Sequence, residues 1–333
     1  MCLPQKETTL TIQLSTSALG IALAIALAGP AVAEEKLLIG STSASSSQYG
    51  YFVAVGQIVN AKVPDVTSTV VETGATLDNL RRMERNQVDF GLITTNVLHH
   101  AVNGTAEFDG KAKQYPLLWV YSPAPQNVVV RQDSGITDMA GMTGKRINPG
   151  IRGSATESTT EQVLAAIGVE PEYVRGSTTD VVDLIKDNRL SGYVKSGAGM
   201  RPDASTLDIA TFTPISILGL TADQRKIIET ELTDLSVVDI PENPDNGIPA
   251  YSTWSFALGV ASRPELSEET AYQIVKAVME DKTAQSGALA ELKGVNLADV
   301  TLKYGTTPLH PGAARWFTEN GYEIPDALKP VAP

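Results

Sequence analysis

An α/β fold of two hinged lobes is predicted by two observations on this sequence. Short apolar runs alternate with stretches of helical periodicity, and this alternation begins near residue 37 and again near residue 145. Such alternation is typical of parallel sheets covered by helices. The chain has 333 residues, which is more than a single core usually organises. Two domains are therefore expected, and a plain tandem of two domains is the alternative to a discontinuous, hinged pair.

The first half of the chain predicts three strands separated by two helices. Residues 37–40 read as a short buried strand, and the small, hydroxyl-rich residues 41–47 read as a loop. A helix is predicted from Gly50, with Phe52, Val55 and Val59 on one face. A strand at 67–72, a helix at 76–86 and a strand at 88–93 complete this unit.

The second half repeats this alternation after a crossing rich in proline. Two extended runs, 117–120 and 127–131, are separated by Ser122-Pro-Ala-Pro125, which predicts a broken strand. Sequences typical of a capping box start predicted helices at Ser154 and Thr221, and Ser267 caps a later helix. Further strands are predicted at 145–147, 171–174, 192–195 and 255–261, with a helix at 179–188.

These elements predict a division of the chain into three parts. Residues 1–33 are expected to be a signal peptide, residues 34–126 plus 255–333 a discontinuous first lobe, and residues 127–254 a second lobe. The chain would then cross between the lobes twice, and such crossings form a hinge with a cleft beside it.

The apolar run at residues 18–33 predicts export. It ends in Ala31-Val32-Ala33, the small-x-small pattern of a secretory cleavage site, and it is too short for a good membrane span. A buried N-terminal helix is the alternative. Cleavage near Ala33 would give a periplasmic protein without cysteine, because Cys2 is the only one in the sequence, and without disulfides.

Charge and motifs narrow the function classes. The net charge of −12 argues against binding to nucleic acid or to anionic membranes, but not against a small anion held by local positive groups. The sequence has no G-x-S-x-G, Ser-x-x-Lys, H-E-x-x-H or P-loop pattern. With three histidines and no cysteine after the signal, neither an enzyme nor a metal or cofactor site is expected.

Polar residues follow several predicted strands at the point where each strand ends. In open α/β sheets ligands bind beyond the carboxyl ends of the strands, and a helix start offers free N–H groups that suit a carboxylate. The candidate binding residues are Ser43, Ser45, Ser46 and Tyr49 after the first strand, Thr94, Thr95 and Asn96 after the third, Gly153, Ser154, Ala155 and Thr156 at a helix start, and Lys195 and Arg201 at a later strand end.

An ordered set of segments resembles the TAXI-type solute receptors, which are the extracytoplasmic binding proteins of TRAP (tripartite ATP-independent periplasmic) transporters. The segments are residues 40–49 with the following helix, Glu72-Thr-Gly-Ala-Thr-Leu-Asp-Asn-Leu80, Asp89-Phe-Gly-Leu-Ile-Thr-Thr-Asn96, Val129-Val-Arg-Gln-Asp-Ser-Gly-Ile136, Gly144-Lys-Arg-Ile147, Gly153-Ser-Ala-Thr-Glu157 and Pro308-Leu-His-Pro-Gly-Ala313. The resemblance implies a type II-like periplasmic-binding-protein fold, a small carboxylate ligand such as a glutamate-like amino acid, a 2-oxoacid or a dicarboxylate, and a membrane permease as partner.

This chain departs from the family pattern in three places. Side chains replace the usual glycines in residues 40–46, Thr94-Thr95-Asn96 replaces Gln-Ser-Asp, and Lys195 replaces an apolar residue. The loss of an anion and the gain of a cation favour a di- or oxo-carboxylate ligand countered by Lys195. An amino-acid receptor, a ligand-sensing domain for a signalling partner and an exported enzyme remain alternatives. The receptor is expected to be a monomer.

Overall fold

The computed structural model describes Met1 and residues 34–331. The predicted signal peptide, apart from Met1, lies outside the described residues, so the structure does not test it. The described chain forms an α/β structure in which helices cover a curled sheet, as the alternation of the sequence predicts.

The strands form one connected sheet that is parallel in part. Its order is β2-β1-β3-β10-β4-β7-β5-β6, with β8 paired to β4 and β9 paired to β10. The strands are β1 (Glu35–Gly40), β2 (Val66–Val71), β3 (Phe90–Thr94), β4 (Leu117–Arg131), β5 (Arg146–Asn148), β6 (Glu172–Tyr173), β7 (Gly192–Ser196), β8 (Ile215–Leu218), β9 (Ser236–Ile240) and β10 (Tyr251–Ser262). The pairs β1–β2, β1–β3, β5–β6 and β5–β7 are parallel.

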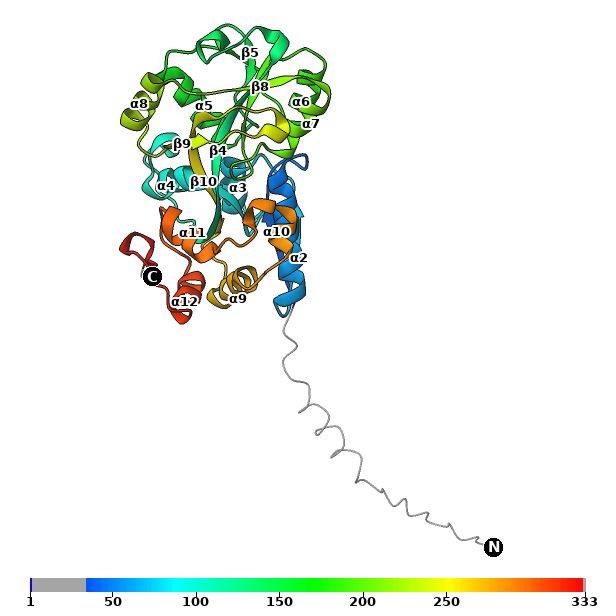
Figure 1. Ribbon diagram of the computed structural model, residues 1–333. Helices are drawn as coiled ribbons and strands as arrows, with labels where there is room; N and C mark the ends of the chain where they lie inside the picture. Colours follow the sequence, from blue (N-terminus) through cyan, green and yellow to red (C-terminus); the bar gives the residue numbers. More distant parts are fainter. Residues whose placement is uncertain (2–33, 332–333) are drawn as a thin grey trace.

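The helices lie on both sides of this sheet and gather at its two ends (Figure 1). They are α2 (Ser47–Lys62), α3 (Thr76–Glu84), α4 (Thr95–Asn103), α5 (Ala155–Ala166), α6 (Thr178–Lys186), α7 (Ala204–Phe212), α8 (Ala222–Glu231), α9 (Glu268–Met279), α10 (Ala284–Ala288), α11 (Leu297–Tyr304) and α12 (Pro311–Glu319). Figure 1 shows α5–α8 at one end of the molecule and α2 and α9–α12 at the other.

The two longest strands, β4 and β10, connect these ends (Figure 1). The prediction that Pro123 and Pro125 break the first of them is wrong, because β4 is continuous and pairs with β10 through both prolines. Residues two apart direct their N–H groups to the same edge of a strand, so the two prolines remove donors from one edge only. The other edge keeps its pairing.

Two predicted helix starts differ from the observed ones. Helix α2 begins at Ser47 instead of Gly50, because the Ser46 side chain caps it by accepting from the Gln48 N–H at 3.3 Å. The predicted capping box of α5 is only half formed. Ser154 accepts from the Glu157 N–H at 3.1 Å, but the Glu157 carboxylate accepts from the Gly153 N–H at 2.8 Å instead of from the Ser154 N–H.

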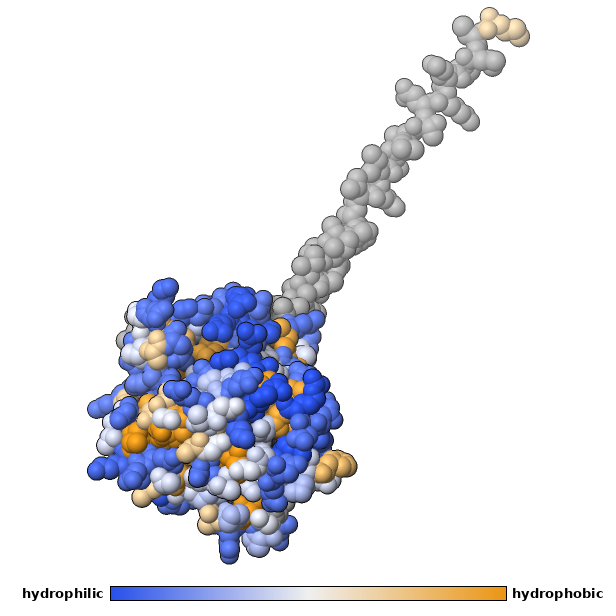
Figure 2. Space-filling model, turned by 90° about the horizontal axis from the view of Figure 1, so that it is seen from above, coloured by the Kyte–Doolittle hydropathy of each residue, from blue (hydrophilic) through white to orange (hydrophobic). Residues whose placement is uncertain are grey.

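The surface of the protein has the mixed character of a water-exposed fold. Figure 2, which views the end that carries α5–α8, shows mainly hydrophilic residues with separate, small apolar patches. Among the described residues, no helix has the length and apolar character needed to cross a membrane. The same part of the chain contains no group of three or more His, Cys, Asp or Glu side chains arranged to hold a metal ion.

Candidate ligand-binding site

A small cavity lies where the ends of β1, β3 and β7 meet the start of α5. Its volume is about 40 Å³, and a water needs about 10–15 Å³ measured in this way, so it holds about three water-sized groups. The cavity is lined by Thr42, Ser46, Gln48, Ala75, Thr76, Leu92, Thr94, Ile151, Ser154, Ala155, Thr156, Lys195, Ser196 and Leu258. The residues that follow several strand ends therefore line one partly open pocket.

Nearly half of the predicted site residues line this cavity. They are Ser46, Thr94, Ser154, Ala155, Thr156 and Lys195. They come from segments that are far apart in the sequence, and the folded chain brings them together from the loop before α2, the end of β3, the start of α5 and the end of β7.

Three predicted residues of the first loop lie outside the cavity lining. The Ser43 and Ser45 hydroxyls are 3.1 Å apart, and Ser45 accepts a hydrogen bond of 3.3 Å from the Thr179 hydroxyl at the start of α6. Tyr49 is half-buried on α2. Ser45 thus contacts the second part of the chain without reaching the cavity.

Four other predicted residues also lie outside the lining. The Thr95 hydroxyl accepts from the Ala257 N–H at 3.2 Å and so joins α4 to β10. The buried Asn96 Oδ1 has no hydrogen-bond partner within the described chain. Arg201 is exposed. The Gly153 carbonyl accepts from the Leu77 N–H at 2.9 Å, which ties the start of α3 to the loop before α5.

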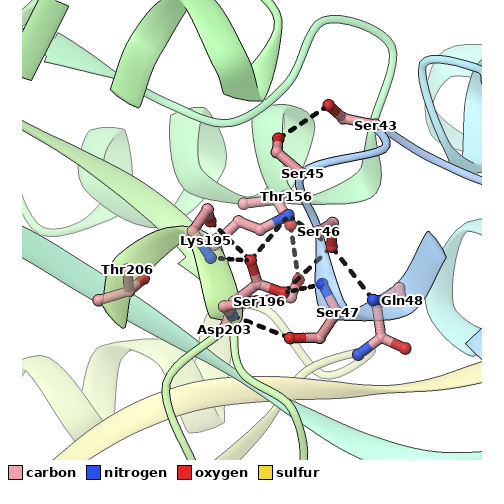
Figure 3. Close-up of polar contacts among 12 residues, drawn as sticks. Ser43, Ser45, Ser46, Ser47, Gln48, Thr156, Lys195, Ser196, Asp203 and Thr206 are labelled. Atoms are coloured by element: carbon pink, nitrogen blue, oxygen red, sulfur yellow. Dashed lines mark hydrogen bonds and ion pairs between the residues drawn. The ribbon is translucent and has the colours of Figure 1, made fainter. Parts of the chain in front are cut away.

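Lys195 is buried and directed towards the first loop (Figure 3). Its ammonium donates to the Ser46 hydroxyl at 3.1 Å and lies 3.9 Å from Oδ1 of Asp203. An ammonium has three N–H donors, so Lys195 can still donate to a ligand. Its charge, however, already faces a carboxylate of the protein.

Asp203 contacts both Lys195 and Ser46, and the sequence analysis did not predict it. Its side chain is fully buried and accepts from the Ser46 hydroxyl at 3.1 Å and the Ser47 N–H at 2.9 Å. It also caps α7 by accepting from the Ser205 N–H at 3.0 Å. An Asp followed by helix-forming residues is a helix-start signal, and Pro202-Asp203-Ala-Ser-Thr206 carries it. The capping role is visible in the sequence, but the contact with Ser46 is not.

Gln48 lines the cavity and carries an amide donor without a partner within the described chain. The Tyr121 hydroxyl donates to its Oε1 at 2.8 Å, which orients the amide and directs Nε2 away from Tyr121. Within the described chain Nε2 has no hydrogen-bond partner, and the same holds for the Thr94 hydroxyl. Both side chains are 3 % exposed and both line the cavity. Buried polar atoms are rarely unpartnered in proteins, so these two atoms indicate a place for a polar ligand.

The start of α5 adds backbone donors. The first N–H groups of an α-helix have no partner inside the helix, and Ser154 satisfies only that of Glu157. The first two helical residues, Ala155 and Thr156, both line the cavity. Their N–H groups and the helix dipole favour a negative charge at this point.

Comparison with known proteins assigns the family. The family model described as "NMT1-like family" matches residues 39–321, which is most of the chain. The chain belongs to the NMT1-like family. Its members are periplasmic solute-binding proteins, so the protein is classed as a solute-binding receptor for transport.

Solved structures agree with the two-lobed fold of this NMT1-like protein. One is titled "Structure of a periplasmic transporter", at 10 % identity and a TM-score of 0.53, with 88 % of this chain and 98 % of that chain covered. Another is titled "Putative L-Cystine ABC transporter from Listeria monocytogenes", at 10 % identity and a TM-score of 0.50, covering 77 % and 95 %. At this identity the likeness concerns the fold alone.

A polar cluster forms one wall of the cavity in this NMT1-like protein. The Thr156 hydroxyl donates to Oε1 of Gln126 at 2.9 Å and lies 2.9 Å from the Ser196 hydroxyl. Gln126 Nε2 donates to Ser196 at 3.1 Å. Gln126 belongs to β4, so the strand that connects the two ends of the molecule also holds the side chains at the start of α5 in place.

A larger groove of about 840 Å³ lies between α9 and α12, away from these residues. It is lined in part by Trp316 and Tyr322, whose rings stack with centroids 6.0 Å apart. None of its described lining residues carries a buried polar atom without a partner. The smaller cavity is therefore the better candidate for the solute site.

Proposed function

We propose that this protein captures a small organic anion, a di- or oxo-carboxylate, outside the cytoplasm and delivers it to a TRAP-type membrane permease. In this proposal the ligand carboxylate binds at the start of α5 beside Lys195. The lobes are residues 34–126 with 255–333 and residues 127–254, and the ligand bridges them.

The observation that carries the proposal is the excess of hydrogen-bond donors around the cavity. Ala155 and Thr156 at the start of α5, Lys195 and Gln48 line one space of about 40 Å³, and each of them carries a hydrogen-bond donor. No carboxylate is among the described lining residues. Donors around one space favour an acceptor-rich ligand, and charge-assisted bonds to a carboxylate are the strongest of this kind.

The permease partner, the TAXI subtype and the periplasmic location rest on the resemblance described above. Solute-binding proteins of this class bind small ligands and deliver them to membrane transporters. The ordered segments from residue 40 to residue 313 support a TRAP permease as that transporter.

An amino-acid ligand is the second candidate. The positions of the carboxylates near the cavity argue against it. An ammonium needs an acceptor that has room for a further bond. Asp203 already accepts from Ser46, Ser47 and Ser205, and Glu157 accepts from the Gly153 N–H and from Arg175 at 2.8 Å. Neither carboxylate lines the cavity.

A thermal-shift screen of the protein without residues 1–33 tests the proposal, because a ligand bound only by the folded state raises the unfolding midpoint. We expect shifts with dicarboxylates or 2-oxoacids and none with amino acids. Lys195→Met should abolish the shift. Its matched control is Lys186→Met, since Lys186 donates to Asp208 at the surface and should leave the shift intact. If no carboxylate produces a shift, the proposal is wrong.

A further inference from the structure

We infer that Asp203 is a specificity-determining residue: it neutralises Lys195 and thereby restricts the cavity to ligands with a single negative charge. The inference rests on the proposed carboxylate function and chooses between the two ligand classes that it leaves open. It assigns a role in selection to a residue that touches the lysine without lining the cavity.

The charge around the cavity is the first argument. Lys195 is the only ionisable side chain among the described lining residues, and the Asp203 carboxylate lies 3.9 Å from its ammonium. Asp203 is 0 % exposed and Lys195 is 9 % exposed, so solvent screens their interaction little. One buried cation and one buried anion cancel, and the attraction left for a ligand comes from the start of α5 and from neutral donors.

The contacts of Asp203 fix it in this position. It holds the start of α2 through Ser46 and Ser47 (Figure 3). It also caps α7 through Ser205. The same Ser46 hydroxyl accepts from Lys195. The carboxylate therefore cannot turn away from the lysine without leaving several donors unsatisfied.

Among the residues that the structure describes, the cavity lining holds no counter-charge for a second carboxylate. Beyond the polar groups already described, its lining includes the apolar side chains of Ala75, Leu92, Ile151 and Leu258. A charge buried without a partner is strongly disfavoured. The volume of about 40 Å³ corresponds to about three waters, so the part of a ligand that enters this space is small. A carboxylate with an uncharged remainder fits this distribution of charge.

Three ligands of nearly the same shape separate charge from size. Pyruvate, oxamate and oxalate have the same number of non-hydrogen atoms, and at neutral pH the first two carry one negative charge and oxalate carries two. Isothermal titration calorimetry on the protein without residues 1–33 should show pyruvate and oxamate binding at least about tenfold more tightly than oxalate. The methyl of pyruvate and the amide of oxamate take the place of the second carboxylate of oxalate.

Asp203→Asn tests the residue itself. Asn caps helices as well as Asp, so α7 should keep its start, while the charge of Lys195 is released. The preference for oxamate over oxalate should fall by about tenfold or more. The matched control is Asp180→Asn, which changes an exposed Asp at the start of α6 and should leave the preference unchanged.

Three results would overturn the inference, and they differ in what they leave standing. If the unmodified protein binds oxalate or larger dicarboxylates as tightly as oxamate, Asp203 does not restrict the charge, and the proposed function still holds. If Asp203→Asn folds but keeps the original preference, another group sets it. If no carboxylate of any size binds, both the inference and the proposed function fail.

Discussion

At the scale of single residues, we expect the Thr94 hydroxyl to lower the stability of the free protein and to strengthen ligand binding. It is buried and has no partner within the described chain, so it costs stability in the free protein. We expect Thr94→Val, which keeps the shape, to raise the free energy of unfolding by about 1 kcal/mol and to weaken binding of the solute. Urea unfolding and calorimetry measure the two effects.

Thr160→Val is the matched control for that change. The Thr160 hydroxyl on α5 is also buried and unpartnered among the described residues, but Thr160 does not line the cavity. The Thr160→Val protein should be more stable than the unmodified protein and should bind the solute with the same affinity. A Thr94→Val protein that binds as tightly as the unmodified one would show that the hydroxyl does not meet the ligand.

Residue-level prediction from the sequence succeeded where the backbone alone places a group. Ser154, Ala155 and Thr156 line the cavity because a helix start follows a strand end, and that pattern is local. Asp203 was missed because its partner Ser46 is 157 residues away. Gln48 was missed because only its contact with Tyr121, 73 residues further on, reveals which way the amide points.

At the scale of secondary-structure elements, the close approach of β1 and β3 depends on the glycine at position 91. A Cβ on Gly91 would lie 2.2 Å from the Gly40 carbonyl oxygen. This oxygen belongs to the backbone, so it cannot move aside as the end of a flexible side chain can. We expect Gly91→Ala to lower stability by about 3 kcal/mol, read as a fall in Tm. Gly50→Ala is the contrast, because a Cβ there meets nothing within 4 Å and α2 should gain about 0.5–1 kcal/mol.

Most elements could be predicted because their signals are local, and the errors have identifiable causes. The sequence analysis placed a break between 120 and 127, but the pairing of β4 with β10 keeps the strand continuous. Whether a strand tolerates a proline depends on the strands that pair with it. The strand's own sequence does not reveal which strands these are. Helix α7 was overlooked for a different reason: its apolar spacing is weak, and only its cap at Asp203 marks it.

At the scale of the whole molecule, an ion pair joins two segments distant in the sequence. Nε2 of His100 on α4 lies 2.9 Å from Asp234, just before β9. The hydrogen bond from His100 lowers the pKa of Asp234 below 3.8, and the same bond raises the pKa of His100 above 6.5. The pair therefore stabilises fully between about pH 3.8 and 6.5. Its contribution is lost as pH rises through the raised His100 pKa, and also as pH falls through the lowered Asp234 pKa.

Asp234→Asn tests this linkage. We expect the variant to lose about 1 kcal/mol of stability at pH 5.5 and little at pH 8.5, measured as the difference in Tm from the unmodified protein at each pH. Glu107→Gln is the control, because Glu107 acts on His100 only at longer range. A difference in Tm that is the same at both pH values would contradict the assignment.

The position of β10 has a consequence for how the chain folds. This strand, at residues 251–262, lies between β3 and β4, so the sheet formed by the first part of the chain cannot close until residue 262 is available. Contacts so far apart in sequence form late, and their loop closure slows folding. We therefore expect the nascent chain to stay without its central sheet until about four-fifths of it has been made. A fragment ending before residue 251 would leave two strand edges unpaired and prone to aggregation.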